Sequence, residues 1–190
     1  MIPARRPRDP VPMIDEAVDT SLIVGEARAT VRATPDEVFA FVLDLERYRR
    51  ADHKIGRVGE MRRNGNAGTV RFSGRLRGLP GPAGTYPFTL TGDRLVFGTP
   101  VAGPARWFLE HFEGSFDCEP TDDGTLVTHR EAYRFRRPWR WLADRLLRSW
   151  LENDTAGEMV RLKALLEAGQ EAQEAQSADA TDAGEEGSAP

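Results

Sequence analysis

Residues 29–50 read ATVRATPDEVFAFVLDLERYRR, and this stretch decides the fold. It completes an alternating segment over 23–33, a pattern typical of a β-strand with one buried face. Thr34 then offers a helix N-cap, Pro35 suits the first helical position, and Glu37 completes a capping box with Thr34. We therefore predict a strand that leads directly into a short helix, followed by a second short helix or turn.

Between residues 55 and 136 the chain alternates short strand-like stretches with turns. NGNAG at 64–68 and TDDG at 121–124 are turn sequences between alternating segments. GLPGPAG at 78–84 is predicted to be a loop, because its prolines and glycines suit neither a helix nor the interior of a strand. The pattern predicts about six antiparallel strands in succession, which form a meander.

One long helix is predicted to follow Pro138. The sequence WRWLADRLLRSWLENDTAGEMVRLKALLEAG spans about 30 residues, or roughly 45 Å at 1.5 Å per residue. A kink near 153–157 is compatible with its asparagine and glycine. The apolar stripe of this helix is expected to contain Leu142, Leu146, Trp150, Met159, Leu162 and Leu166.

The two ends of the chain differ in composition from the rest. Residues 1–20 hold four prolines and no periodic pattern, and residues 169–190 hold six acids with no basic or large apolar residue. Such compositions are typical of disordered segments, because they cannot bury enough apolar surface to offset chain entropy. We expect one folded domain over 21–168, of class α+β, with helices on one side of a curved antiparallel sheet.

Charge and cysteine content exclude several classes of protein. The whole chain has a net charge of −4, whereas residues 21–168 contain 23 basic and 20 acidic residues, too small an excess to indicate a nucleic-acid-binding protein. The only cysteine, Cys118, rules out an intramolecular disulfide. The sequence shows neither a secretory signal nor an apolar run of 18 residues, so we expect a soluble, cytoplasmic protein.

With these elements in place, the sequence resembles the START-like (SRPBCC) superfamily, which includes Bet v 1-like proteins, lipid-transfer START domains and polyketide cyclase/dehydrases. The resemblance extends over roughly residues 22–168 and includes the order of the elements. The residues that carry it are Ala33, Pro35, Val38, Phe39, Asp44, Leu45 and Tyr48. It implies the helix-grip fold, in which a curved sheet of about seven strands surrounds the long C-terminal helix and leaves an apolar cavity between them.

The resemblance also implies what the protein does. We expect binding or transport of a hydrophobic small molecule, such as a lipid, a polyketide or an aromatic metabolite, in the interior cavity. The alternative is an enzyme of the polyketide cyclase/dehydratase type that uses general acid/base residues there. A third reading is an interaction protein whose cavity is filled by its own aromatic side chains. No cofactor is expected.

The stretch VTHREAYRF, residues 127–135, contains the sharpest candidates for chemistry. Read as a strand, it places His129, Glu131 and Tyr133 on one face between apolar residues. A buried carboxylate must pair, become protonated or meet water. Three readings stay open: Glu131 pairs with an arginine such as Arg71 or Arg106, or anchors a ligand, or acts with its neighbours in acid/base catalysis.

Aromatic residues on the inward faces of the predicted strands are candidates for the cavity lining, although ordinary core packing is an alternative for each. In the segment 106–118 both faces are mixed, and the phenylalanine face is favoured as the inward one. The predicted lining residues are Phe72, Tyr86, Phe88, Phe97, Phe108, Phe112, Phe116 and Phe135.

Residues 134–150 combine six arginines with three tryptophans. This composition suits weak contact with an anionic membrane surface. Because arginine is abundant throughout the chain, we favour the alternative of an amphipathic helix whose tryptophans pack on the sheet and whose arginines are solvated. The three histidines, His53, His111 and His129, lack ligand-like spacing, so no metal site is predicted.

Overall fold

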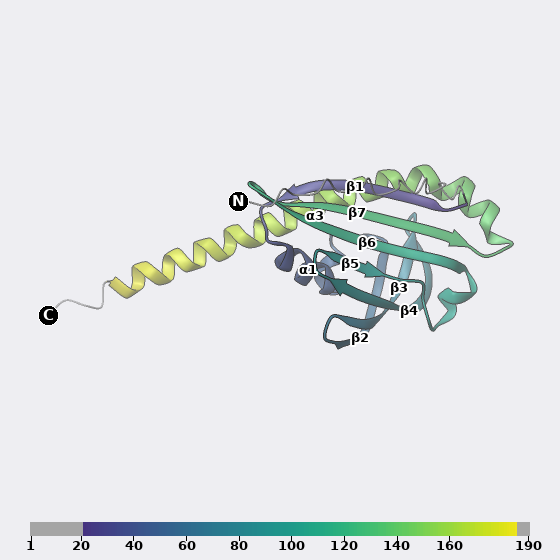
Figure 1. The fold of residues 1–190 in the computed structure, drawn as a ribbon, viewed down its shortest axis with the longest axis horizontal. Helices are drawn as coiled ribbons and strands as arrows, with labels where there is room; N and C mark the ends of the chain where they lie inside the picture. The colour runs from purple at the N-terminus through teal and green to yellow at the C-terminus, as the bar shows by residue number, and fades with distance from the viewer. Residues whose placement is uncertain (1–20, 186–190) are drawn as a thin grey trace, which may run out of the picture.

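The computed structural model describes residues 21–185, with side chains to residue 172. The N-terminal segment predicted to be disordered, 1–20, lies outside the described residues. The elements, drawn in Figure 1, are β1 (Ile23–Val31), α1 (Pro35–Leu43), α2 (Leu45–Tyr48), β2 (Ile55–Asn64), β3 (Ala67–Leu76), β4 (Leu79–Thr91), β5 (Arg94–Phe97), η1 (Pro104–Trp107), β6 (Leu109–Thr121), β7 (Gly124–Phe135) and α3 (Trp139–Glu185).

The seven strands form one antiparallel sheet in the order β1-β7-β6-β5-β4-β3-β2. Strands β2 to β7 are a continuous meander, and β1 closes the sheet by pairing with β7 from Ile23↔Tyr133 to Val31↔Thr125. The helix α3 runs along β1 and β7, and α1 lies at the end of the sheet where β1 finishes (Figure 1). This arrangement confirms the predicted α+β class and the helix-grip fold.

The capping box predicted at the start of α1 is present. The Thr34 side chain accepts a hydrogen bond from the Glu37 backbone N–H at 3.3 Å, and the Glu37 carboxylate accepts one from the Thr34 N–H at 2.8 Å. Both bonds satisfy donors that a helix start otherwise leaves unpaired. They fix the direction in which the chain leaves β1, so α1 buries Val38, Phe39 and other apolar side chains under the sheet.

The contact between α3 and β1 depends on a glycine. A Cβ atom at Gly25 would lie 2.5 Å from Thr155 Oγ1 and 3.0 Å from the Leu151 carbonyl oxygen, so only glycine admits the helix this closely. The buried side of α3 contains Leu151, Thr155, Glu158 and other residues at helical spacing. A polar and an ionisable residue therefore lie inside the interface between helix and sheet.

The predicted stripe of α3 is correct only in its second half. Leu142 and Leu146 are 42 % and 44 % exposed, whereas Leu162 and Leu166 are buried. In the first half of the helix the buried residues are Ala143 and Leu151 instead, and of the predicted residues only Trp150 is partly buried against the core. The helix is continuous through residues 153–157.

The helix α3 also continues beyond residue 168, to Glu185, into the segment whose composition predicts disorder. The segment 169–185 is rich in alanine, glutamate and glutamine, which are strong helix formers, and it extends a helix that is already nucleated. Figure 1 shows this part projecting away from the sheet. The limits of the packed domain, 21–168, stay a prediction, and residues 186–190 lie outside the described residues.

The segment 78–84 is not the predicted loop. Residues 79–84 form the first half of β4, which is joined to β3 by a two-residue turn in which Arg77 and Gly78 have φ of 52° and 80°. Strand β5 pairs with β4 only from Phe88 onward, so the first half of β4 has a partner strand on one side alone. Proline is tolerated on such an edge, which is why Pro80 and Pro82 do not break the strand.

Strand β6 begins later than predicted. Arg106 and Trp107 belong to the short helix η1, and the register between β6 and β7 shifts between Leu109 and His111. From Phe112 onward the expected alternation holds, with Phe112 and Phe116 buried. The phenylalanine face of this segment is therefore the inward face.

Candidate functional site

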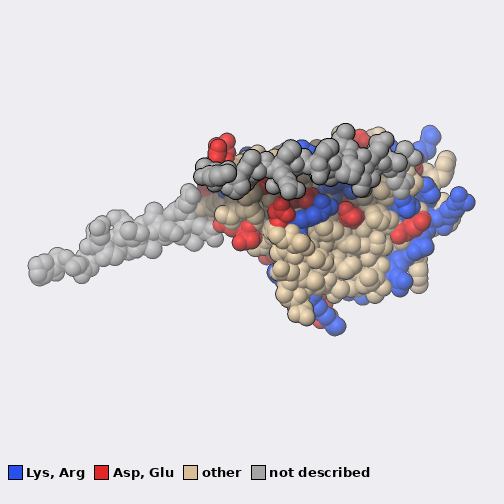
Figure 2. All heavy atoms as spheres, viewed as in Figure 1, with Lys and Arg blue, Asp and Glu red and all other residues tan. Residues whose placement is uncertain are grey.

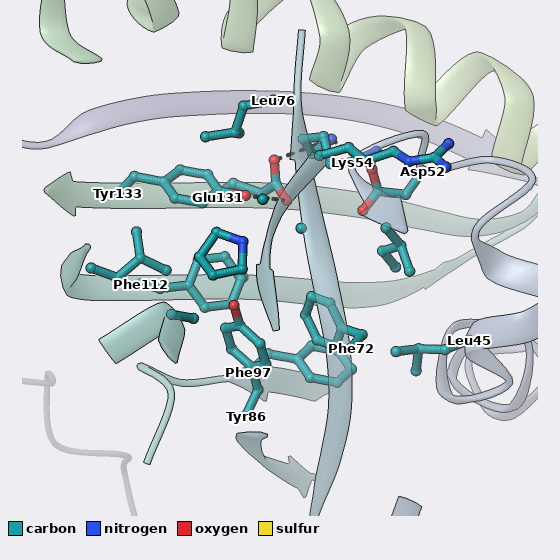
Figure 3. Close-up of a pocket in the computed structure, with 18 of the residues that line it drawn as sticks. Leu45, Asp52, Lys54, Phe72, Leu76, Tyr86, Phe97, Phe112, Glu131 and Tyr133 are labelled. Carbon is teal, nitrogen blue, oxygen red and sulfur yellow. Dashed lines mark hydrogen bonds and ion pairs between the residues drawn. The ribbon is translucent and has the colours of Figure 1, made fainter. Parts of the chain in front are cut away.

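The inner face of the sheet and α2 enclose a cavity of about 110 Å³. Figure 3 shows its lining side chains, among them the stacked rings of Phe72 and Tyr86, whose centroids are 4.1 Å apart. Apolar and aromatic groups form most of the wall, and Figure 3 shows Asp52, Lys54 and Glu131 close together at one end. Among side chains described, those lining the cavity come from the sheet, α2, η1 and adjoining loops, not from α3 as the family resemblance implied.

Seven of the eight aromatic residues predicted to line the cavity do so. They are Phe72, Tyr86, Phe97, Phe108, Phe112, Phe116 and Phe135. Phe88 does not, because it lies further along β4, where its ring packs against Phe97 with centroids 5.9 Å apart and under Gly68. That position is ordinary core.

The three polar candidates on β7 lie together on the cavity wall. His129 and Glu131 are 2 % and 4 % exposed, and both line the cavity with Tyr133. The Tyr133 hydroxyl donates to Glu131 Oε1 at 3.3 Å, and His129 Nε2 lies 3.9 Å from the same oxygen. Figure 3 shows Glu131 and Tyr133 side by side, facing the space above Phe112. The alternation of the strand thus brings the three together, and their role stays a proposal.

The partner of Glu131 is a lysine, not an arginine. Lys54, in the loop before β2, places its Nζ 3.3 Å from Glu131 Oε2. The same Nζ lies 3.0 Å from Asp52 Oδ1, 2.9 Å from Asp154 Oδ2 and 2.5 Å from Glu158 Oε2. We call Lys54, Asp52, Glu131, Asp154, Glu158 and His129 the ionic cluster.

Glu158 joins α3 to this cluster. It is fully buried, and its Oε1 accepts a hydrogen bond from the Tyr48 hydroxyl and lies 3.2 Å from His129 Nε2. The other ring nitrogen of His129, Nδ1, is 2.9 Å from the Ser115 carbonyl oxygen, and the ring stacks on Phe116. These contacts hold the imidazole in one orientation at the polar end of the cavity.

Burial and charge shift the titration of the cluster in opposite directions. Burial alone would lower the pKa of His129, but Glu158 and Glu131 raise it to about 9. Burial alone would raise the pKa of Glu158, but His129 and Lys54 hold it well below its usual range. Burial also opposes the charge on Lys54, yet Asp52, Glu131 and Glu158 raise its pKa well above the usual value. Both cations are therefore charged at neutral pH.

Glu131 differs from Glu158 although both are buried. Burial raises the pKa of Glu131 to about 7, and the opposing attraction of Lys54 does not cancel this effect. Within the described residues its Oε2 makes no hydrogen bond. A carboxylate that titrates near neutral pH beside a cavity can exchange a proton with a ligand or accept a hydrogen bond from it.

The sequence reasoning missed Lys54, Asp52, Asp154 and Glu158, and it named Arg71 and Arg106 as partners of Glu131; both arginines are exposed. Two signals were present in the sequence. Lys54 is one of two lysines in a chain with 24 arginines, and Glu158 falls on the buried side of the long helix.

Two sets of side chains in the cluster have metal-ligating atoms within 4.8 Å of one another: His129 with Glu131 and Glu158, and Asp52 with Asp154 and Glu158. The ammonium group of Lys54 lies within 3.3 Å of all four carboxylates and so occupies the position of a cation. The cluster therefore already contains its counter-ion.

The start of α3 presents apolar and basic groups outward. Trp141 is 72 % exposed and so does not pack on the sheet as one reading of the sequence required. Trp139 is 47 % exposed but its ring contacts Phe108 with centroids 5.6 Å apart, and Trp150 is partly buried against the core. Figure 2 shows basic side chains gathered at this end of the molecule. Across the described part of the chain, no helix is both long and apolar enough to span a membrane.

Comparison with known proteins identifies the class that this fold and cavity define. The family model described as "Polyketide cyclase / dehydrase and lipid transport" matches residues 23–167. The chain therefore belongs to this family, as the resemblance in its sequence indicated. No curated protein matches it by sequence.

Several solved structures share the fold at low sequence identity. A protein from Thermus thermophilus is 17 % identical with a TM-score of 0.63, over 77 % of this chain and 98 % of that one. The Zhui aromatase/cyclase from Streptomyces sp. R1128 is 15 % identical with a TM-score of 0.63, over 77 % and 94 %. A START superfamily protein from Mycobacterium smegmatis is 14 % identical with a TM-score of 0.54, over 79 % and 97 %.

Proposed function

We propose that this protein binds a hydrophobic small molecule, such as a lipid, polyketide or aromatic metabolite, in the cavity beneath its sheet. The observation that carries the proposal is an aromatic-lined cavity with a group of charged side chains, Asp52, Lys54, His129 and Glu131, in its wall. Ligand sites have this character, because the apolar wall supplies affinity and the few polar groups supply orientation. Family membership supports the same function.

The first test is native mass spectrometry of the gently purified protein, with solvent extraction of anything bound. An added mass of a few hundred daltons that extracts into organic solvent is the expected result. A bare mass matching the 21.2 kDa chain after expression in several hosts would contradict tight carriage of a ligand.

A cavity-filling variant tests the place of binding. Gly74 lines the cavity, and a Cβ atom there would meet nothing within 4 Å, so Gly74→Leu fills the space without a backbone clash. We expect it to fold and to lose binding of an aromatic probe such as naphthalene. The matched control is Arg71→Leu, an exposed position on the same strand. Unchanged naphthalene affinity in Gly74→Leu would place the ligand elsewhere.

An enzyme of the cyclase/dehydratase type is the second candidate, favoured by the position of Glu131 beside the cavity and by its pKa of about 7. In this role Glu131 takes a proton from a carbon next to a ligand carbonyl, and the electron pair moves to that carbonyl oxygen. The test is deuterium exchange of a naphthyl β-diketone in D₂O, followed by NMR. Glu131→Gln must abolish protein-dependent exchange while naphthalene still binds; exchange unchanged by this substitution would exclude Glu131 as the base.

The surface that we propose for membrane contact includes exposed side chains outside residues 134–150. Besides Trp141, the side chains of Trp107 and Leu79 are exposed, by 75 % and 72 %. Arg77 in the β3–β4 turn donates to the Leu146 carbonyl oxygen, so this turn lies against the first part of α3. Exposed tryptophans among arginines suit an anionic bilayer surface. The bilayer is the occupant that we propose for this surface.

Co-sedimentation with phosphatidylcholine vesicles, with and without phosphatidylglycerol, tests this contact. Binding should require the anionic lipid and weaken with salt, because Debye screening shortens the reach of surface charges. Trp141→Ala should reduce it several-fold, whereas Val160→Ala, an exposed apolar position further along α3, should leave it unchanged. Equal reduction by both substitutions, or no binding to anionic vesicles, would refute the contact.

A further inference from the structure

At the polar end of the cavity there are more carboxylates than the lysine can donate hydrogen bonds to. An ammonium group has three N–H donors, whereas four carboxylates surround Lys54. Lys54 donates to Asp154 at 2.9 Å and to Glu158 at 2.5 Å, and Asp52 Oδ1 lies 3.0 Å away. Glu131 Oε2, at 3.3 Å, is the most distant of the four. The nearer carboxylates therefore take up the donors of the lysine.

Glu131 is left with one unused acceptor on the cavity wall. Its Oε1 accepts from the Tyr133 hydroxyl, whereas among the described side chains Oε2 makes no hydrogen bond and has only the ion-pair contact with Lys54 at 3.3 Å. The residue is only 4 % exposed. A buried acceptor without a donor is unfavourable, and the loss is recovered when a ligand supplies the missing N–H or O–H. Glu131 lines the cavity, so a ligand can reach it.

The charge of the cluster determines which ligand groups fit this acceptor. Four carboxylates face two cations, Lys54 and His129, and both cations are already within 3.3 Å of cluster carboxylates. A ligand carboxylate would bring another negative charge into this excess. The nitrogen His129 Nε2 makes no hydrogen bond among the described residues, but Glu158 Oε1 at 3.2 Å and Glu131 Oε1 at 3.9 Å already face its charge. Arg75, the other cationic side chain among the cavity-lining residues, is exposed and lies outside the cluster.

We propose that the buried end of the cavity selects a neutral hydrogen-bond donor, such as a phenolic or alcoholic hydroxyl, and excludes a carboxylate. This inference rests on the proposed function, since it assumes that an apolar molecule occupies the cavity. The ligand lies with its hydroxyl at Glu131 and its apolar body along the aromatic wall. Hydrogen bonds to a charged acceptor are stronger than neutral ones, so the hydroxyl should raise affinity about tenfold or more over its apolar parent.

Three probes of one skeleton test the inference: naphthalene, 2-naphthol and 2-naphthoate, each titrated into the full chain at pH 8 by calorimetry or fluorescence. At this pH 2-naphthol is neutral, 2-naphthoate is ionised and Glu131 is mostly ionised. We expect 2-naphthol to bind at least tenfold more tightly than naphthalene and 2-naphthoate to bind more weakly than naphthalene.

The outcomes separate the inference from the function on which it rests. Absence of binding by all three probes counts against the cavity as a ligand site, and the inference falls with it. Binding of naphthalene together with tighter or equal binding of 2-naphthoate relative to 2-naphthol overturns the inference alone. If Arg75→Gln then abolishes the naphthoate binding, the ligand is anchored at the arginine instead of at Glu131.

Two variants test whether Glu131 is the source of the preference for 2-naphthol over 2-naphthoate. Glu131→Gln keeps the shape of the side chain and removes its charge, so the preference for 2-naphthol over 2-naphthoate should fall about tenfold. Phe72→Leu changes the aromatic wall and should weaken both probes equally, leaving their ratio unchanged. Circular dichroism confirms that each variant is folded. An unchanged ratio in Glu131→Gln would refute the assignment of selectivity to this carboxylate.

Discussion

Removal of the Lys54 charge is the sharpest test of the ionic cluster. Lys54→Met keeps most of the side-chain volume but leaves three buried carboxylates and the partly buried Asp154 with His129 as their remaining cation. Loss of one partner from a buried ion pair costs about 3–5 kcal/mol, because the other charge stays buried without compensation. The four contacts do not add, since protonation of the carboxylates relieves part of the repulsion. We therefore expect a loss of about 4 kcal/mol.

The other lysine of the chain provides the matched control. Lys163 is on the surface of α3, where it lies 3.3 Å from Glu167, and its side chain is 46 % exposed. Exposed pairs of this spacing contribute about 0.5 kcal/mol, so Lys163→Met should lose less than about 1 kcal/mol. In thermal unfolding, a loss of about 4 kcal/mol corresponds to a melting temperature of Lys54→Met about 8–16 °C below that of the unmodified protein.

Urea unfolding at pH 8 and pH 5 measures both variants. The deficit of Lys54→Met should shrink at pH 5, because its folded form takes up protons on the crowded carboxylates more readily than its unfolded form does. Equal stability of the two lysine variants at pH 8 would refute the reasoning, since the ammonium group would then contribute no more inside the cluster than on the surface. A deficit that is independent of pH would show that packing, and not charge, is lost.

Three further predictions concern separate parts of the molecule. The pKa of His129 is raised to about 9, so the stability that its charge contributes is complete below pH 6.5 and is lost between pH 6.5 and 9. Urea unfolding should therefore show the free energy of unfolding falling by up to about 3 kcal/mol over this range, and His129→Gln should abolish this pH dependence. Gly25→Ala should cost about 1–3 kcal/mol in thermal unfolding, because its methyl group would press on Thr155, whereas Gly74→Ala should not. Thr34→Ala should cost about 1 kcal/mol through loss of the α1 cap, and Thr34→Ser, which keeps the hydroxyl, should restore it.

The fold was predictable because its signals are local. The capping box at Thr34, the alternation of the strands and the spacing of their turns each involve residues close in sequence, and the structure confirms them. Alternation also placed His129, Glu131 and Tyr133 on the cavity wall. The prediction of a loop at 78–84 was wrong, because whether prolines disrupt a strand depends on the neighbouring strand, which local sequence does not specify.

The ionic cluster was not predictable by the same reasoning. Lys54 and Glu158 are 104 residues apart in sequence, and only the docking of α3 on the sheet brings them together. A pattern of apolar residues records which face of an element is buried, but it does not record which buried polar groups meet. The rarity of lysine in this arginine-rich chain is the one sequence feature that marks Lys54, and it does so without indicating a partner.

The surroundings of Glu158 and Glu131 shift the pKa values of these two glutamates in opposite directions. Glu158 accepts a hydrogen bond from the Tyr48 hydroxyl and contacts both Lys54 and His129. The two cations keep its pKa low, so the stability that its ionised form contributes is present above its ordinary pKa and is lost at acid pH. Glu131 has a raised pKa, so its ionisation between about pH 4.5 and 7 destabilises the folded chain.

Substitution of each glutamate by glutamine measures this difference at pH 8. Glu158→Gln should lose about 3–5 kcal/mol in urea unfolding, because Lys54 and His129 lose their nearest counter-charge. Glu131→Gln should be neutral or stabilising, because it removes a carboxylate that is unfavourable when ionised. Similar losses in the two variants would mean that Glu131 is as firmly held as Glu158, and its carboxylate would then not be available to a ligand.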